Sequence, residues 1–478
     1  MKNKLMRLLG VEVKSLKVFE RVLLLAPILL WFAYWPVIRI GGNATMNFEL
    51  SLALIYCVVL ALTGLPLIWR SRDMLVKSPA VLLSGVFILW SATTIIWSDN
   101  PLRGVLSVGI AGVLWLVLLA VLADRKRVQK LAPALTKLLL LATMIICAFE
   151  LVQFVGGIWL SRREPLLLCL GCSAVQFGFV RPNVFAIEPQ FLGNMLLLPT
   201  LILTRRLIIK RWSRQNVLMF MVALSGLFLT MSRGAIYAFV IGAIVLATVY
   251  YKQWRRLLSG IGLTVAVFVI ALVMQGFAAA LNPHLTESFG GAIAKVVSQL
   301  SLGAINLDKP SKFNSDVDVS VNTDVPEQAT AKASNEVKPR YDGYVAESTD
   351  VRTNFSKVAL SVWRSNPHNM LIGVGVGGAG AAMARYEHSD WSKEIVQNEF
   401  VEVLMERGVI GLGLLLLLIG IIVYVLWRSH NVWALAILIA YLVQYCFFSG
   451  LPNALHVYVA VAVLLGALTS NHLQKRLK

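Results

Sequence analysis

The stretch EVLMERGVIGLGLLLLLIGIIVYVLW, residues 402–427, decides the fold class of this chain. Its three charged residues lie in the first six positions, and the 20 residues after Arg407 carry no charge. A helix of about 20 apolar residues is long enough to cross the hydrocarbon core of a bilayer. The stretch therefore predicts a membrane-spanning helix whose charged end lies near one membrane surface.

The composition of the whole chain agrees with a membrane protein. Of its 478 residues, 58% are hydrophobic and 14% are charged, whereas ordinary soluble domains are about 45–50% apolar and about 25% charged. So few polar residues cannot cover the surface of a soluble protein of this size. We predict an all-α integral membrane protein with about 12 transmembrane helices, near residues 22–40, 48–69, 79–97, 104–123, 137–157, 186–204, 215–231, 234–251, 259–278, 402–427, 431–449 and 452–470.

The formal net charge of +19 first suggests a nucleic-acid partner, because Lys and Arg attract phosphate backbones. The distribution of the charges excludes that class. If the N-terminus is cytoplasmic, the segments on that side hold 25 Lys and Arg against four acids, and the outer side holds 18 against 21. This asymmetry follows the positive-inside rule. It predicts a multi-pass protein with both termini cytoplasmic and no nucleic-acid partner.

The longest connection divides the chain into three parts. Residues 1–278 hold the first nine predicted spans, residues 279–401 form a large outer loop, and residues 402–478 hold the last three spans. Within the loop, residues 306–350 are polar and without periodicity, which predicts a flexible insert. Apolar residues recur at helical spacing on both sides of it, at positions 289, 293, 296, 297 and 300 and at positions 355, 358, 359, 362 and 363. They predict amphipathic helices that pack against each other or lie on the membrane.

Two of the five cysteines form a Cys-x-x-Cys pair, Cys169 and Cys172, in an outer connection. Outside the cytoplasm such a pair can form a disulfide, and two free thiols are the alternative. A zinc site would need two further ligands, and residues 158–185 contain no His.

The glycine-rich segment GVGVGGAG, residues 373–380, follows an amphipathic helix and not a buried strand. This context excludes a dinucleotide-binding fingerprint. Two interpretations stay open: a tight connection without a ligand, or a loop whose exposed backbone N–H groups line a substrate site.

Charged residues in or beside the apolar runs gather at the predicted outer ends, and the middles of the runs are nearly free of charge. The residues concerned are Arg39, Glu49, Glu150, Glu188, Arg233, Glu402, Glu406 and Arg407. An ion-coupled transporter needs ionisable groups near the membrane midplane, so this distribution argues against one. The functional site is expected at the outer membrane surface.

Three arginines are the candidate ligands of an anion at that surface. Arg233 lies in a turn between two apolar runs with no acid beside it, so it either meets an anionic ligand or reaches lipid phosphate. Arg181 opens the motif RPNVFAIEPQ, residues 181–190, and Arg352 begins the second amphipathic helix. Guanidinium groups bind phosphate oxygens in a bidentate manner. We expect all three to converge on one diphosphate, with no metal or other cofactor.

In the order and placement of these motifs, the chain resembles the O-antigen ligase and O-antigen polymerase superfamily of bacterial membrane glycan transferases. The resemblance rests on residues 181–189, on Ser232-Arg233-Gly234, on the Arg352 helix followed by NPHNMLIGVG at 366–375, and on QNEFVEVLMERGVIGL at 397–412. It implies a GT-C-like fold in the bacterial inner (cytoplasmic) membrane, with the active site on the periplasmic side.

The resemblance also implies a reaction. A glycan would pass from undecaprenyl diphosphate to a sugar hydroxyl of an acceptor glycan or of lipid A core, in the synthesis of lipopolysaccharide O-antigen or a related surface polysaccharide. Arg233 and Arg352 would bind the donor diphosphate and Arg181 would assist, without a cofactor. Preorganised cations would stabilise the charge that develops on the leaving oxygen.

One position departs from the family pattern, because Gln397 stands where ligases of the family carry the histidine that is their proposed general base. Glutamine cannot accept a proton at working pH. Gln397 could still orient the acceptor, and His388, Glu188 and Glu399 are the alternative bases. This departure favours a polymerase over a ligase, and both interpretations of the reaction stay open.

The alternative outside the enzymes is a flippase or exporter of lipid-linked oligosaccharide. Such a protein should carry cationic groups down a central cavity to move a diphosphate through the membrane. In this sequence the cationic candidates stay at one side.

Overall fold

The computed structural model describes residues 16–32, 37–40, 48–160, 165–166, 169–173, 175–176, 179–186, 188–209, 212–283, 288–301, 343–388, 395–429, 431–450 and 454–468. Most of the predicted insert, residues 306–342, lies outside the described residues, as do the side chains of Cys169 and Cys172. The last part of the predicted insert, residues 343–350, forms the first two turns of a helix, so the prediction of a flexible segment is wrong for these residues.

Seven helical segments of the described chain are long and apolar enough to cross a membrane. They are α4 (Leu52–Arg70), α6 with η2 (Pro79–Thr94 and Ile95–Trp97), α7 (Pro101–Ala123), α8 (Arg125–Gly157), α9 (Pro189–Ile209), η3 with α12 (Tyr251–Gln253 and Trp254–Leu281) and α17 (Glu399–Arg428). Shorter apolar helices occupy four more predicted spans: α10 (Arg214–Leu229), α11 (Arg233–Val249), α18 (Val432–Tyr445) and α19 (Leu455–Leu468). The described helices agree with a helical membrane protein.

The first predicted span, residues 22–40, is not one helix. The structure has two short helices there, α2 (Val18–Leu23) and α3 (Ala26–Leu29), followed by strand β1 (Val37–Ile40). Strand β1 pairs with β2 (Phe48–Ser51) in an antiparallel hairpin. The β-branched residues of β1 favour a strand, and the apolar character of a run alone does not separate helix from strand.

Two further pairs of short strands show that the chain is not entirely α-helical, contrary to the all-α prediction. Strands β3 (Pro165–Leu166) and β4 (Cys169–Ser173) pair with each other, as do β5 (Val175–Gln176) and β6 (Phe179–Val180). Both ladders lie between α8 and α9. The last of these strands leads directly into residue Arg181, so the ladders matter for the position of the site.

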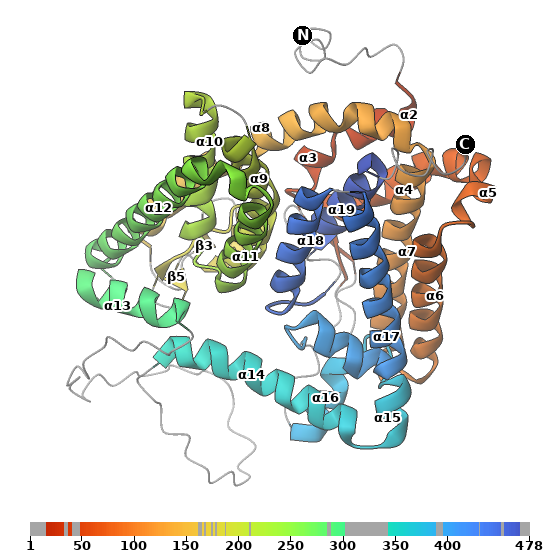
Figure 1. Ribbon diagram of the computed structural model, residues 1–478. Coiled ribbons are helices and arrows are strands. Elements are labelled where there is room, and N and C mark those ends of the chain that lie inside the picture. Colours follow the sequence, from red (N-terminus) through yellow and green to blue (C-terminus); the bar gives the residue numbers. More distant parts are fainter. Residues whose placement is uncertain are drawn as a thin grey trace.

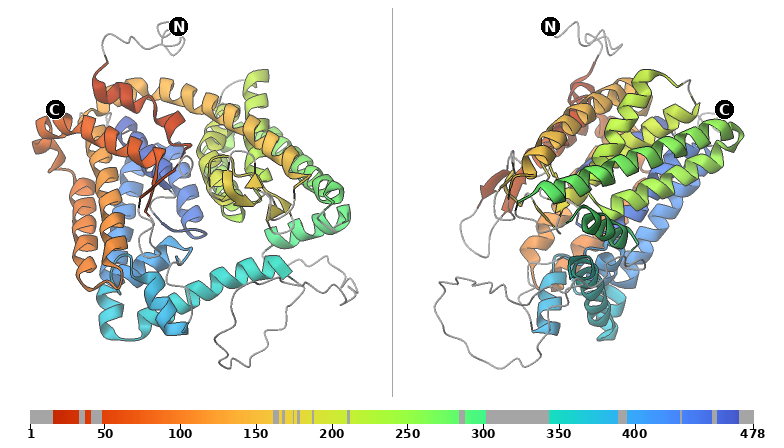
Figure 2. Two further views of the ribbon diagram at one scale, coloured as in Figure 1. Left: turned by 180° about the vertical axis from the view of Figure 1, so that it is seen from behind. Right: turned by 90° about the vertical axis from the view of Figure 1, so that its left-hand side faces the viewer.

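The helices form a bundle with two crossing elements (Figure 1). Helices α9 to α12 lie in one half and α4, α6, α7 and α17 in the other, and the view from behind shows the same division (Figure 2). Helix α8 crosses one end of the bundle, and α14 (Gly343–Arg364) crosses the opposite end. Helices α11 and α18 join the halves, because a Cβ at Gly242 would lie only 3.1 Å from the Cβ of Ala440.

Four helices of the large loop lie at the α14 end of the bundle. They are α13 (Phe289–Leu300), α14, α15 (Pro367–Ile372) and α16 (Ala379–Glu387). Both predicted amphipathic helices are therefore present. The apolar face of α14 is buried through Phe355, Val358, Ala359 and Val362, and it packs on α16 and the first part of α17 in a core of their own. Helix α13 packs on α12 through Phe289 and Phe277, so these loop helices contact the bundle as well as each other.

Candidate functional site

The segment after β6 fixes the turn that precedes α11. The buried guanidinium of Arg181 donates from Nε to the carbonyl of Thr230 at 2.9 Å and from an Nη atom to the carbonyl of Met231 at 3.5 Å. Met231 adopts a positive φ of 49°, and Ser232 caps α11 by accepting from the N–H of Ala235 at 3.4 Å. Arg181 therefore holds the loop that places Arg233.

Arg233 is the first residue of α11, and its side chain is buried. The N-terminus of a helix carries a partial positive charge and unpaired backbone N–H groups. A guanidinium at this position adds a full positive charge. The first turn of α11 is thus suited to an anionic ligand.

Arg352 reaches the same region from α14. It donates a hydrogen bond to Oε1 of Gln190 at 2.8 Å, and Nε2 of Gln190 donates to Oε2 of Glu188 at 2.7 Å. Burial lowers the pKa of the Arg352 guanidinium below its ordinary value, and the nearby Glu188 carboxylate opposes that shift. These hydrogen bonds connect the loop helix α14 to the beginning of α9.

Arg233 and Arg352 lie close enough for their charges to act on each other. Two partly desolvated like charges raise the free energy of the folded protein unless an anion accompanies them. The Glu188 carboxylate supplies one negative charge beside Arg352, and the region is suited to an anionic ligand that supplies more.

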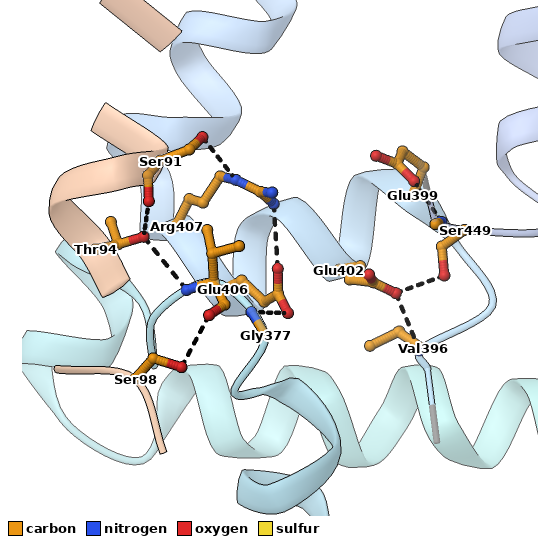
Figure 3. Close-up of polar contacts among 12 residues, drawn as sticks. Ser91, Thr94, Ser98, Gly377, Val396, Glu399, Glu402, Glu406, Arg407 and Ser449 are labelled. Carbon is orange, nitrogen blue, oxygen red and sulfur yellow. Dashed lines mark hydrogen bonds and ion pairs between the residues drawn. The ribbon is translucent and has the colours of Figure 1, made fainter. Parts of the chain in front are cut away.

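A second polar cluster surrounds the beginning of α17 (Figure 3). Oε2 of Glu402 accepts from the Ser449 hydroxyl at 2.5 Å and from the N–H of Val396 at 3.2 Å. Oε2 of Glu399 accepts from the N–H of Gly450 at 3.0 Å, and the N–H of Gln397 donates to Ser449 Oγ at 3.1 Å. These carboxylates bind the segment that follows α18.

The segment after α18 connects this cluster to the arginines. A Cβ at Gly234 would lie 2.7 Å from the Cβ of Phe447 and 2.9 Å from Oε1 of Gln444. Glycine at 234 thus lets the first turn of α11 approach residues 444–447, while Ser449 and Gly450 contact the beginning of α17. The arginine site and the Gln397 region border the same short segment.

The glycine-rich segment is a tight connection. The N–H groups of Val374 and Gly375 donate to the carbonyls of Met405 and Glu406 at 2.9 Å, and the N–H of Gly377 donates to Oε1 of Glu406 at 2.8 Å. At Gly373, φ is 77° and a Cβ would lie 2.3 Å from the backbone of Glu406. These backbone donors bind α17, so the alternative of a substrate-lining loop is not supported by the contacts.

Arg407 is held inside the protein at the kink of α17. Its Nε donates to Ser91 Oγ at 3.0 Å, and an Nη atom pairs with Oε2 of Glu406 at 3.3 Å (Figure 3). The helix kinks at the next residue, Gly408, where φ is 66°. Arg407 and Glu406 thus join α6 to α17 and to the glycine-rich segment.

His388 stands apart from both clusters. It ends α16 in a left-handed conformation, with φ 52° and ψ 46°, and its side chain is exposed. None of the contacts given for the described residues joins it to the arginines.

Residues 218–416 match a family model described as O-antigen ligase. This match supports the resemblance of the chain to the O-antigen ligase and polymerase superfamily. Its match to the O-antigen ligase family extends from α10 into α17 and includes Arg233, Arg352, Gln397 and Glu399. The match indicates a membrane glycan transferase of the O-antigen ligase type. A comparison with curated proteins gives no match.

The fold brings together residues that the sequence placed far apart. Arg181, Arg233, Arg352 and Glu188 lie in one region, whereas Gln397 and Glu399 lie in the neighbouring cluster and His388 lies in neither. Among the described residues, no group of three or more His, Cys, Asp or Glu is placed to hold a metal.

Sequence reasoning missed the importance of Gln190 and Ser449. Gln190 stood inside the quoted motif, yet nothing in its spacing showed that it would contact Arg352. Ser449 lies in a segment that was assigned to a membrane span. Only the fold brings these two polar residues to the site.

Proposed function

We propose that the protein transfers a glycan from undecaprenyl diphosphate to a sugar hydroxyl of an acceptor, at the end of the bundle that α14 crosses. The observation that carries the proposal is the convergence of Arg233 and Arg352, which come from the first turn of α11 and from the loop helix. In this site the two guanidinium groups bind the donor diphosphate, and Arg181 holds the turn that places Arg233.

The chemistry follows from this placement. The bond between the anomeric carbon and the diphosphate oxygen breaks, the acceptor oxygen bonds to that carbon, and the acceptor proton passes to a base. Negative charge grows on the leaving diphosphate, so cations fixed beside it stabilise the transition state more than the bound donor. No metal is needed in this scheme, because the arginines supply the positive charge.

Among the base candidates, the contacts favour Glu188. Its exposed carboxylate is joined through Gln190 to Arg352, so it borders the place where the diphosphate binds. Glu399 is engaged with the backbone of Gly450, His388 lies elsewhere, and the amide of Gln397 cannot take a proton. We assign Gln397 to the orientation of the acceptor and Glu188 to proton removal.

The membrane orientation is part of the proposal. The basic residues of α5 (Arg72–Leu75) and of the beginning of α8 lie at the end of the bundle opposite α14 (Figure 1), and the positive-inside rule assigns that end to the cytoplasm. We therefore place the arginine site at the periplasmic face of the bacterial inner membrane, both termini in the cytoplasm, and residues 279–401 outside.

The test is a transfer reaction with the purified full chain, an undecaprenyl-diphosphate-linked glycan, and two competing acceptors. Lipid A core and a second lipid-linked glycan are supplied together, and product mass identifies the acceptor used. We expect a new glycosidic product and release of undecaprenyl diphosphate. Product on lipid A core defines a ligase, and a lengthened lipid-linked glycan defines a polymerase.

The same preparation in vesicles separates transfer from export. If the lipid-linked glycan crosses the bilayer while no acceptor is ever extended, the protein is a flippase and the proposed reaction is wrong.

A further inference from the structure

A cavity of about 210 Å³ opens on the lipid-facing side of the half-bundle formed by α9 to α12. Its wall is almost wholly apolar, with Phe220, Phe239, Ala243 and Ile261 among the lining residues. Some of these side chains face outward, since Ile261 is 56% and Val265 is 54% exposed. In a membrane, such a hollow must be filled by hydrocarbon, because water would find few polar partners there.

The cavity lies away from the arginine site. It is lined by the last turns of α9, by the second half of α11 and by the first turns of α12. The α11 residues that line the cavity run from Phe239 to Ala247, a rise of about 9–21 Å from Arg233 along the helix. The hollow therefore extends toward the end of α11 opposite Arg233 and is not part of the donor-binding region.

Cationic and aromatic residues immediately precede Arg256, the charged residue that lines the cavity. Lys252 and Arg255 are exposed, and Trp254 is 57% exposed with the Arg255 guanidinium 5.5 Å from the centre of its ring. No Asp or Glu occurs in residues 250–258. Trp and Arg of this kind are typical of the membrane interface, where cations meet lipid phosphates.

Arg256 has a different role. It donates to the carbonyls of Ile208 and Ile209 at 3.2 and 3.1 Å and to Oε1 of Gln253 at 2.7 Å. These bonds satisfy carbonyl groups at the end of α9 and hold the Arg256 side chain at the edge of the cavity. The positive charge of Arg256 is thereby held at the boundary between the apolar wall and the headgroup region.

We propose that this cavity is a binding site for an anionic phospholipid of the leaflet opposite the arginine site. One acyl chain fills the hollow between α9, α11 and α12, and the phosphate headgroup pairs with Lys252 and Arg255. The chemistry of the mouth selects the headgroup, because an apolar hollow alone would accept the chain of any lipid. The bound lipid supports the helices that carry Arg233.

Two glycines of α12 provide a matched pair of variants. Gly260 lines the cavity, Gly262 does not, and a Cβ at either position would meet nothing within 4 Å. G260L therefore fills the hollow from within, while G262L adds the same side chain to another side of the helix. Because neither substitution causes a clash at Cβ, both variants are expected to fold.

The experiment measures lipid retained by the purified full chain in detergent, by native mass spectrometry. The probes are dioleoyl phosphatidylglycerol, dioleoyl phosphatidylcholine and undecaprenyl phosphate. We expect the wild type and G262L to retain phosphatidylglycerol about tenfold more tightly than phosphatidylcholine. We expect G260L to lose this retention.

A second variant tests the headgroup independently of the hollow. In K252Q combined with R255Q, the preference for phosphatidylglycerol over phosphatidylcholine should disappear while acyl-chain binding persists. Equal retention by G260L and G262L would overturn the site, and equal retention of the two phospholipids by the wild type would overturn its anionic selectivity. Displacement of phosphatidylglycerol by undecaprenyl phosphate at lower concentration would overturn the phospholipid assignment. None of these readouts depends on glycan transfer.

Discussion

Arg352 of α14 donates a hydrogen bond to the side-chain oxygen of Gln190 at 2.8 Å, across 162 positions of sequence. This contact joins the large loop to the membrane bundle at the place where Arg233 begins α11. A loop helix thereby becomes part of the candidate site, and its arginine is fixed relative to the start of α9.

Removal of either diphosphate arginine should abolish most transfer. We expect R233A and R352A to lower kcat by about 10²–10³, because each takes away a charge that stabilises the leaving group. Lysine at either position should restore only part of the rate, since an ammonium cannot form the bidentate contact. The measurement is product formation from the lipid-linked donor by protein that is fully inserted.

The matched control for these variants is K357A, which removes an exposed cation from the same helix as Arg352. It should transfer at the wild-type rate. If R233A and R352A behave like K357A, the diphosphate role is wrong.

The choice of base predicts a contrast between Glu188 and Gln397. E188Q should lower kcat by at least about 10² with little change in donor affinity, whereas Q397A should cost less than tenfold. Initial rates with saturating donor separate the two. A Q397A defect as large as that of E188Q would show that the amide takes part more directly than we infer.

Gln190 should act on donor binding through Arg352. Q190E places a carboxylate against the guanidinium and cancels part of its charge, so KM for the donor should rise with a smaller change in kcat. Q190A removes the hydrogen bond alone and should raise KM less. A donor KM that is identical in all three proteins would exclude a positioning role.

Arg181 should show a stability defect together with its activity defect. R181A leaves the carbonyls of Thr230 and Met231 without the bonds described above, and a buried unpaired polar group costs about 1–3 kcal/mol. We expect a lower unfolding temperature in detergent and slower transfer. If R181A loses transfer while its unfolding temperature is unchanged, Arg181 contacts the substrate and does not merely support the turn.

The kink of α17 should depend on glycine. In G408A, a Cβ would lie 2.2 Å from the carbonyl of Leu371 at a φ of 66°, so both the close approach and the backbone conformation oppose it. We expect a clear loss of thermal stability. G413A, where a Cβ meets nothing within 4 Å, is the control and should match or slightly exceed the wild type; equal melting of both variants would refute this account of the kink.

Much of the fold could be predicted because it depends on local apolar periodicity. Lipid requires long apolar helices, so the predicted spans after the first fall mainly on helices, although residues 48–51 of the second form strand β2. The spacing of Phe355, Val358 and Val362 gave the buried face of α14 correctly. The first run failed because residues 37–40 find a strand partner at 48–51. Such pairing is a tertiary property that the apolar character of a run does not reveal.

The site was predictable only in its residue types. Guanidinium groups on one side of the membrane pointed to an anionic ligand, and the family match agrees with a glycan transferase. The sequence could not distinguish Arg181, which binds backbone carbonyls, from Arg352, which binds the side chain of Gln190. It also left the glycine-rich segment open, because the use of a backbone N–H depends on which distant carbonyl lies beside it.

By itself, the sequence determined that this is a membrane protein, which of its helices have an apolar face, and which arginines are candidates to bind an anionic ligand. These properties follow from the solvation of single side chains and from spacing along one helix. The tertiary structure alone decided which arginines meet, that Gln190 joins Arg352 to Glu188, and that residues 444–450 connect the two polar clusters. Such contacts depend on how remote helices pack, and packing is set by the shape of the whole bundle.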